Sequence, residues 1–222
     1  MKLEFEDIIR QKAPGLTVAL ITANITNPTT PDALWNEIET IAHRLHDSYA
    51  IEMVNKRPAI AGTRQAYKAF GKDPNRYRPS AEALTRRAVR GLDLYRTTAV
   101  VDLINLASLV TGHSIGAFDA DRIDGDTLTL GVGQEGEPYL AIGRGELNIA
   151  GLPVWRDGTG GVGTPTSDND RTKLSESTTK LVVTVNCYDS SEYSASQTAE
   201  LIADLLVRYG SASEIETTLY HP

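Results

Sequence analysis

Four aspartates lie close together at Asp119, Asp121, Asp124 and Asp126, and carboxylates at such short spacing are typical calcium ligands. An EF-hand loop requires an acid or amide at its fifth position, glycine at its sixth and glutamate at its twelfth. Counted from Asp119, the sixth position is another aspartate and the twelfth is Leu130. We therefore interpret this stretch as a polar turn that enters a strand, and not as a calcium site.

The other residues with reactive side chains form no catalytic or metal-binding pattern. His43 and His46 are one helical turn apart, but no third zinc ligand lies near them in the sequence. Cys187 is the single cysteine, so no intramolecular disulfide is possible, and a strand pattern around it predicts a small buried side chain. No Gly-x-Ser-x-Gly motif marks a hydrolase nucleophile. The residues therefore predict no metal, no cofactor and no catalytic side chain.

A glycine-rich stretch, RDGTGGVGTPTS, covers residues 156–167. It lacks the Gly-Lys-Ser/Thr ending of a phosphate-binding loop and opens no obvious helix. Glycines allow the backbone to approach a ligand closely. We interpret the stretch either as a mobile loop beside a pocket, which would include Gly161 and Gly163, or as an ordinary surface loop.

Positive charge is concentrated between Lys56 and Arg96 in a chain whose net charge is −7. This segment holds 11 of the 22 basic residues and three acids, so its charge is +8 and that of the remaining chain is −15. Such asymmetry suggests an anionic partner for the basic segment. The alternative is a pair of solvated helices whose charges pair with the acidic body of the protein.

Hydrophobic periodicity predicts the elements that must position these residues. Alternation and β-branched residues predict strands, and apolar residues at helical spacing predict helices. The predicted helices cover residues 29–50, two short segments within 57–91, a buried helix at 97–112, and 194–210; the predicted strands cover 15–25, 126–133, 137–143, 152–157 and 179–189. This order predicts an α+β fold in which helices flank a sheet.

The sequence carries no sign of export or of membrane insertion. The first 15 residues alternate charged and apolar side chains and have no apolar signal-peptide core. No run approaches the roughly 18 consecutive apolar residues of a membrane span. We therefore expect a soluble protein in the cytoplasm.

Residues 100–125, VVDLINLASLVTGHSIGAFDADRIDG, resemble a segment of the B3/B4 domain of bacterial phenylalanyl-tRNA synthetase β chains. Residues 177–189, STTKLVVTVNCYD, resemble a later strand of that domain. Residues 62–91 resemble the corresponding part of free-standing B3/B4 proteins. The resemblance implies a layered, β-rich sheet or sandwich flanked by helices, with a single domain over residues 1–222. Its basic helical half would cover about 1–112, its strand-rich half about 113–190, and its last helix about 191–210.

In that family the domain hydrolyses the ester bond that joins a wrongly attached tyrosine to the tRNA for phenylalanine. Carried over by position, Asn105 matches the pocket asparagine, and Ile104 stands where the family has a threonine. Gly116 replaces the pocket histidine, and Thr184 stands at the glutamate that helps to select tyrosine. Glycine has no side chain to bind substrate or position water, so we expect an altered specificity.

The sequence thus leads to a first hypothesis of a B3/B4-type protein that binds tRNA or aminoacyl-tRNA, with hydrolysis of the aminoacyl ester left open. The alternatives are an amino-acid binder or sensor with no RNA partner, and an interaction module whose pocket is vestigial. The predicted pocket residues are Asn105, His113, Gly116, Gly161, Gly163 and Thr184. The predicted RNA-binding residues are Arg64, Lys68, Arg76, Arg78, Arg86, Arg87 and Arg90.

Overall fold

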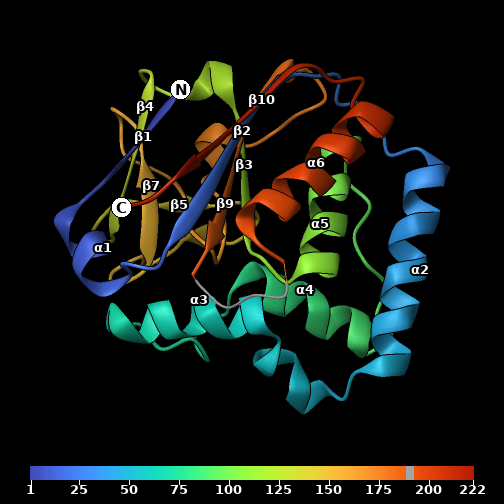
Figure 1. Cartoon of the computed structure of the whole chain (residues 1–222), viewed down its shortest axis with the longest axis horizontal. Helices are drawn as coiled ribbons and strands as arrows, with labels where there is room; N and C mark the ends of the chain where they lie inside the picture. Colours follow the sequence, from blue (N-terminus) through green and yellow to red (C-terminus); the bar gives the residue numbers. More distant parts are fainter. Residues whose placement is uncertain (189–192) are drawn as a thin grey trace.

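Two four-stranded sheets stack face to face, and helices cover the outer face of one of them (Figure 1). The structure is a computed structural model that describes residues 1–188 and 193–222. One sheet has the strand order β1-β4-β7-β8, the second has the order β10-β2-β9-β3, and β5 and β6 form a small hairpin. The expected layered α+β fold is confirmed.

The second sheet is antiparallel throughout, whereas β1 pairs with β4 in parallel. The strands are β1 (Lys2–Phe5), β2 (Thr17–Asn24), β3 (Ile115–Asp119), β4 (Thr127–Val132), β5 (Leu140–Ala141), β6 (Gly145–Glu146), β7 (Pro153–Arg156), β8 (Gly161–Gly163), β9 (Lys180–Cys187) and β10 (Ser213–Tyr220). The α-helices are α1 (Asp7–Lys12), α2 (Asp32–Ser48), α3 (Pro58–Ala69), α4 (Ser80–Val89), α5 (Ala99–Thr111) and α6 (Ala195–Tyr209). Short 3₁₀ helices are η1 (Ile51–Lys56), η2 (Ala120–Arg122) and η3 (Asp170–Thr172).

Alternation along β2 separates two hydrophobic cores. Ala19 and Ile21 face the helices, and Val18 and Leu20 face the other sheet, because successive side chains of a strand point to opposite faces. Strand β9 places Leu181, Val183 and Val185 in the core under the helices, and Val182 in the core between the sheets.

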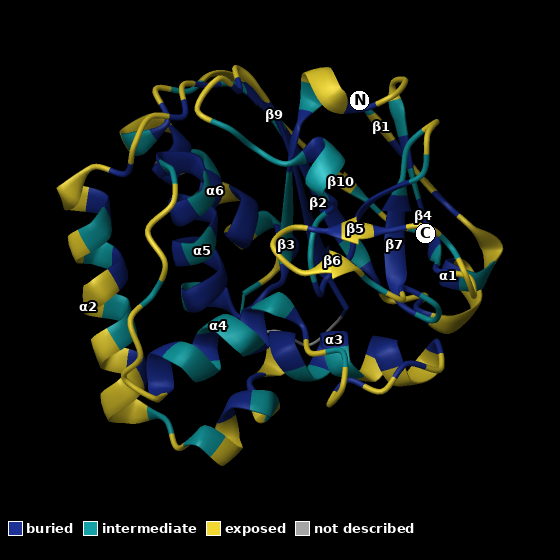
Figure 2. Ribbon diagram, turned by 180° about the vertical axis from the view of Figure 1, so that it is seen from behind, coloured by how far each residue is buried: buried dark blue, intermediate teal, exposed yellow. Residues whose placement is uncertain are grey.

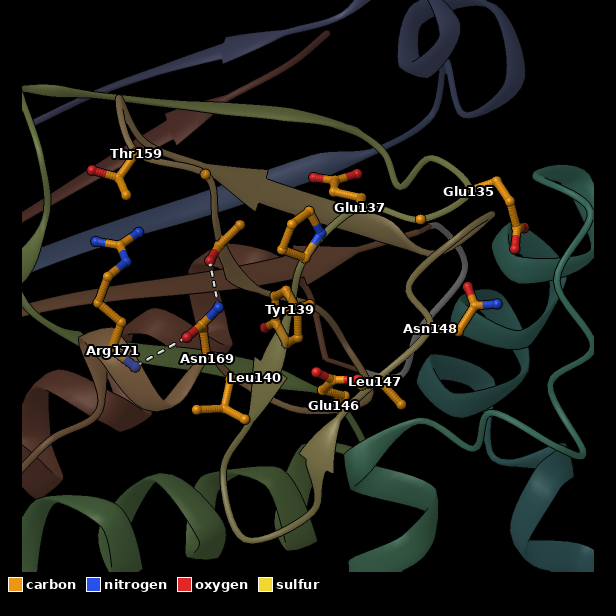
Figure 3. A pocket seen from close by; sticks show the side chains of 14 residues that line it. Glu135, Glu137, Tyr139, Leu140, Glu146, Leu147, Asn148, Thr159, Asn169 and Arg171 are labelled. Carbon is orange, nitrogen blue, oxygen red and sulfur yellow. Dashed lines mark hydrogen bonds between the residues drawn. The ribbon is translucent and has the colours of Figure 1, made fainter.

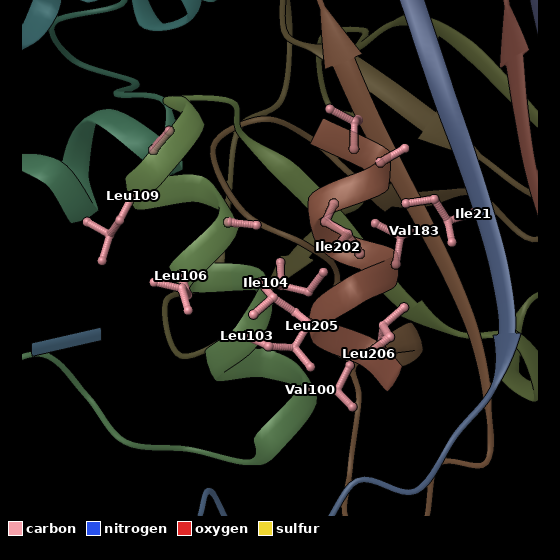
Figure 4. Close-up of a cluster of buried hydrophobic side chains, with 14 of the residues drawn as sticks. Ile21, Val100, Leu103, Ile104, Leu106, Leu109, Val183, Ile202, Leu205 and Leu206 are labelled. Atoms are coloured by element: carbon pink, nitrogen blue, oxygen red, sulfur yellow. The ribbon is translucent and has the colours of Figure 1, made fainter. Parts of the chain in front are cut away.

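Helix α5 is buried on nearly every face, as its sequence predicted, between α6 and the sheet on one side and α2 and α4 on the other (Figures 2 and 4). Leu103 and Ile104 pack with Leu205 and Leu206 of α6 in the same core. The helix ends at Gly112, whose φ of 80° is the left-handed conformation that favours glycine. Asn105 is one of its few partly exposed positions, and this placement defines the site described below.

Some predicted elements need correction. The stretch at 156–167 was predicted to be a loop, but Gly161–Gly163 form β8, which pairs with β7. The strand predicted at 137–143 is reduced to the two residues of β5. Strands β1, β3 and β10 and helix α1 were not predicted. Residues 191 and 192, the start of the last predicted helical part, lie outside the described residues, and α6 begins at Ala195 with a Ser194–Gln197 capping box.

Among the described residues, no helix combines the length and the apolar character that crossing a membrane requires.

Candidate functional site

A cavity of about 510 Å³ lies where α4, α5 and the beginning of β3 meet, and we call it the arginine pocket. Its basic lining residues are Arg78, Arg86, Arg87, Arg90 and Arg144. Asn105 and Ser108 of α5 and Ile115 of β3 also line it. No aspartate or glutamate is among the described residues that line this cavity, so its interior favours an anion.

One buried glutamate holds part of this arginine cluster in place. Glu82 of α4 is buried, with a side chain only 1% exposed, and it pairs with three guanidinium groups. Its carboxylate lies 2.7 Å from Arg64, 2.8 Å from Arg86 and 3.6 Å from Arg78. A single carboxylate cannot neutralise three guanidinium groups, so a net positive charge remains beside the pocket.

Arg87 and Arg90 lie at the C-terminal end of α4. The Nε of Arg87 donates a hydrogen bond to the Asp93 carbonyl, and the Arg87 guanidinium lies 4.3 Å from the centre of the Tyr95 ring. Arg90 is exposed. Because both side chains remain accessible to solvent, they can contact phosphate groups without a large desolvation cost.

Asn105 shares the arginine pocket with these side chains, although it is distant from most of them in the sequence. The turn that follows α5 has other hydrogen-bond donors. Ser108 donates to the His113 carbonyl at 2.7 Å, and Thr111 donates to the Ala107 carbonyl at 2.8 Å. The Asn105 amide is therefore not what caps this turn, and a ligand in the pocket can bind it.

The remaining predicted pocket residues lie deeper or elsewhere. His113 is buried and its Nε2 forms a 2.9 Å hydrogen bond with the Tyr193 carbonyl oxygen. Gly116 and Thr184 are register partners on β3 and β9. A Cβ atom at Gly116 would lie 2.7 Å from the Phe118 ring and 2.9 Å from the Thr184 hydroxyl. The space beside Gly116 is thus filled by neighbouring side chains, and the histidine that the resemblance implies here would fit only if Phe118 and Thr184 moved.

The two glycines of β8 allow aromatic rings to lie against the backbone. A Cβ at Gly163 would lie 2.5 Å from the Phe118 ring, and one at Gly161 would lie 2.8 Å from the Tyr139 ring. Phe118 therefore occupies the space beside two glycines, Gly116 and Gly163. This packing accounts for the glycines whether or not a ligand also approaches them, and their predicted role in a pocket stays a prediction.

Gly161 lines a different cavity of about 760 Å³, the hairpin pocket, between the β5–β6 hairpin and the turn before β8 (Figure 3). Glu135, Glu137 and Glu146 line its walls. Glu137 pairs with Arg156 at 2.7 Å, and the lining residue Arg171 pairs with Asp157 at 2.8 Å. Three carboxylates around its walls make this cavity unfavourable for a phosphate group, so the predicted pocket residues Asn105 and Gly161 face chemically different spaces.

Asp168 is a partly buried carboxyl group that the sequence analysis did not single out. Its Oδ2 accepts a hydrogen bond from the Ala117 backbone N–H at 3.2 Å, next to Gly116 on β3. Burial raises the pKa of Asp168 to about 7. A carboxyl group that titrates near neutral pH can exchange a proton under physiological conditions, which suits general acid–base chemistry.

The predicted RNA-binding residues divide into two groups. Arg78, Arg86, Arg87 and Arg90 line the arginine pocket. The others are Arg64, bound to Glu82 and to the Asn75 side chain, and the exposed Lys68 and Arg76. Two further cations of the basic segment are structural. Arg57 donates to the Leu109 and Val110 carbonyls at the end of α5, and Lys72 donates to the Asn148 and Ala150 carbonyls.

The histidines that were considered as metal ligands line a third cavity, of about 500 Å³, beside Trp35. His46 Nδ1 lies 2.9 Å from the Val89 carbonyl oxygen. Within residues 1–188 and 193–222, no group of three or more histidine, cysteine, aspartate or glutamate side chains could hold a metal ion.

Residues 62–209 match the family model of the B3/4 domain. No curated protein matches the chain. Among solved structures, the chain is similar to an N-terminal fragment of the phenylalanyl-tRNA synthetase beta-subunit from Pyrococcus horikoshii, with 11% sequence identity and a TM-score of 0.46. The similarity covers 97% of this chain and 50% of that fragment, so this chain spans half of its length.

Proposed function

Because the chain belongs to the B3/4 domain family, we propose that it binds the aminoacylated 3′ end of a tRNA in the arginine pocket. In this proposal Asn105 binds the amino-acid moiety, and Arg86, Arg87 and Arg90 bind backbone phosphates. The observation that carries the proposal is that Asn105 and these arginines line one cavity, although α4 and α5 contribute them separately. An aminoacyl-tRNA end requires this combination, since its polar amino-acid group is joined to a polyanion.

The charge of the pocket favours RNA over a free amino acid as the ligand. A free amino acid carries one carboxylate and one ammonium group, so it has no net negative charge to match a cavity lined by five arginines. In an aminoacyl ester the carboxylate charge is absent, but the adjoining phosphates supply negative charge. Phosphate contacts from arginine provide most of the affinity in sequence-independent RNA binding.

Hydrolysis of the aminoacyl ester is the finer part of the proposal. The family resemblance implies this reaction, but Gly116 and Thr184 lack the side chains that the resemblance would use. Asp168 does not line the arginine pocket, but it bonds the Ala117 N–H two residues along β3 from Ile115, which does line it, and its pKa of about 7 suits a general base. In the proposed step, the Asp168 carboxylate accepts a proton from a water molecule while the water oxygen attacks the ester carbonyl carbon. The acyl C–O bond to the tRNA then breaks, and Asp168 returns its proton to the leaving hydroxyl oxygen.

The Arg87→Gln/Arg90→Gln double variant tests RNA binding. We expect tRNA affinity to fall about tenfold at ~100 mM salt, because two phosphate contacts are lost. The slope of log affinity against log salt concentration should become shallower by about two. Filter binding with unfractionated tRNA over a salt series measures both quantities.

The matched control is Arg44→Gln/Arg122→Gln, which removes the same charge from arginines outside the arginine pocket. Its tRNA affinity should change by less than half as much on a logarithmic scale. Equal losses in the two double variants would show that only net charge matters, and an absence of tRNA binding by the wild type would end the proposal.

Asn105→Ala separates a pocket role from a structural role. If Asn105 binds the amino-acid moiety, affinity for an aminoacyl-tRNA should fall about tenfold, the scale of one lost hydrogen bond, while the melting temperature changes little. Affinity for the uncharged tRNA should stay the same. A lower melting temperature with unchanged binding to both RNAs would remove Asn105 from the site.

A further inference from the structure

Tyr95 is the most exposed of the large hydrophobic residues that the structure describes, at 74%. A single exposed tyrosine is ordinary on a protein surface. Tyr95 differs because it lines the arginine pocket and lies in the segment that joins α4 to α5, with Leu92 exposed beside it. Its environment therefore combines a flat aromatic surface, a cavity and an excess of positive charge.

Arg87 holds this ring without burying it. The Arg87 guanidinium lies 4.3 Å from the centre of the Tyr95 ring, and Arg87 Nε is itself anchored on the Asp93 carbonyl. The guanidinium covers one face of the ring, and the high exposure of the residue leaves the other face open to solvent. A ring held in this way loses little conformational freedom when a ligand stacks on it.

An unpaired nucleobase fits this surface better than other ligands do. Single-stranded nucleic acid is typically bound by a positively charged groove together with aromatic side chains on which bases stack. Paired bases are stacked inside a helix and cannot reach an aromatic side chain in this way. An amino-acid side chain alone would not account for the arginines that surround the ring.

We propose that Tyr95 stacks on a base of the unpaired 3′ segment of the bound tRNA, while Arg87 supports the opposite face of the ring. This inference rests on the proposed function and adds to it. It assigns to Tyr95 the recognition of a single-stranded segment, separately from the phosphate contacts of Arg90 and the amino-acid contact of Asn105.

The test compares two RNAs and three proteins. The RNAs are unfractionated tRNA with an intact 3′ end and the same tRNA trimmed of its unpaired 3′ nucleotides. The proteins are the wild type, Tyr95→Phe, which keeps the ring, and Tyr95→Leu, which keeps apolar bulk but has no aromatic face. Fluorescence anisotropy gives the dissociation constants, and circular dichroism confirms that each exposed-site variant folds.

We expect Tyr95→Leu to bind intact tRNA about tenfold more weakly than the wild type, as the loss of one stacked base implies. Tyr95→Phe should stay within about twofold of the wild type, and all three proteins should bind trimmed tRNA equally. If Tyr95→Leu loses equal affinity for intact and for trimmed tRNA, the stacking role is overturned. Wild-type affinity of Tyr95→Leu for intact tRNA also overturns it.

The two proposals fail in different ways. If the wild type binds neither RNA, the proposed function fails and the stacking role fails with it. If the wild type binds both RNAs with strong salt dependence and Tyr95→Leu behaves like the wild type, only the stacking role fails.

Discussion

Replacing Glu82 with glutamine should lower the free energy of unfolding by about 3 kcal/mol. Glu82 is 1% exposed and lies 2.7 Å from Arg64 and 2.8 Å from Arg86, which are themselves largely buried. Glutamine has nearly the same shape but no charge, so these guanidinium groups lose their counter-ion inside the protein. Removing one partner of a buried ion pair is costly for this reason, even where the intact pair contributes little net stability.

Urea denaturation measures this effect as a lower midpoint with an unchanged m-value. Asp32→Asn is the matched control, because the Asp32–Arg96 pair has the same 2.7 Å separation but the Asp32 side chain is 88% exposed. That variant should lose less than about 1 kcal/mol. If both variants lose equal stability, burial of Glu82 is not the cause, and the arginine cluster has another source of order.

Asp168→Asn should stabilise the protein at pH 8 by up to about 4 kcal/mol, and the gain should vanish near pH 4. Burial raises the pKa of Asp168 to about 7, whereas an aspartate in an unfolded chain titrates near 3.9. The folded state thus binds a proton more tightly than the unfolded state. Its contribution to stability is present at low pH and is lost as the pH rises from about 4 to about 7. Asparagine resembles the protonated carboxyl group at every pH and keeps an acceptor for the Ala117 N–H.

Urea unfolding of the wild type and of Asp168→Asn at pH 5 and pH 8 gives the free energy of unfolding of each protein as a function of pH, and the difference between these two profiles tests the prediction. The comparison must be made by difference, because burial also raises the pKa of Asp102, which affects both proteins equally. Parallel profiles would show that the pKa of Asp168 is not raised in the folded protein, and the activity of a base at this position would then not rise through pH 7. In the proposed function, the same variant should also lose the deacylation activity that rises through pH 7.

Local sequence patterns determined the elements whose side chains follow a strong period. The buried helix α5, the long strands β2 and β9 and the amphipathic helices α2 and α6 were all predicted, because each covers at least two turns of helix or eight residues of strand. The concentration of arginines in α4 and the segments around it was also evident from composition alone.

Strands β1, β3 and β10 were not predicted, because their partners are remote in the sequence. Lys2–Phe5 pairs with β4, and Ser213–Tyr220 pairs with β2, so backbone pairing at long range decides their structure. The glycines of β8 suggested a loop, because the aromatic rings that pack against them are remote in the sequence. Only the tertiary structure shows that Phe118 and Tyr139 occupy the space that side chains at Gly163 and Gly161 would need.

The sequence by itself therefore determined the α+β class, the basic segment and Asn105 as an unusual polar residue on a buried helix. The tertiary structure alone decided that Asn105 lines the same cavity as Arg86, Arg87 and Arg90, that Glu82 anchors part of that cluster, and that Gly161 faces a separate acidic cavity. It also decided that a carboxyl group, Asp168, lies beside Gly116. The physical reason is that a site is assembled by packing between elements, whereas periodicity reports only which face of each element is buried.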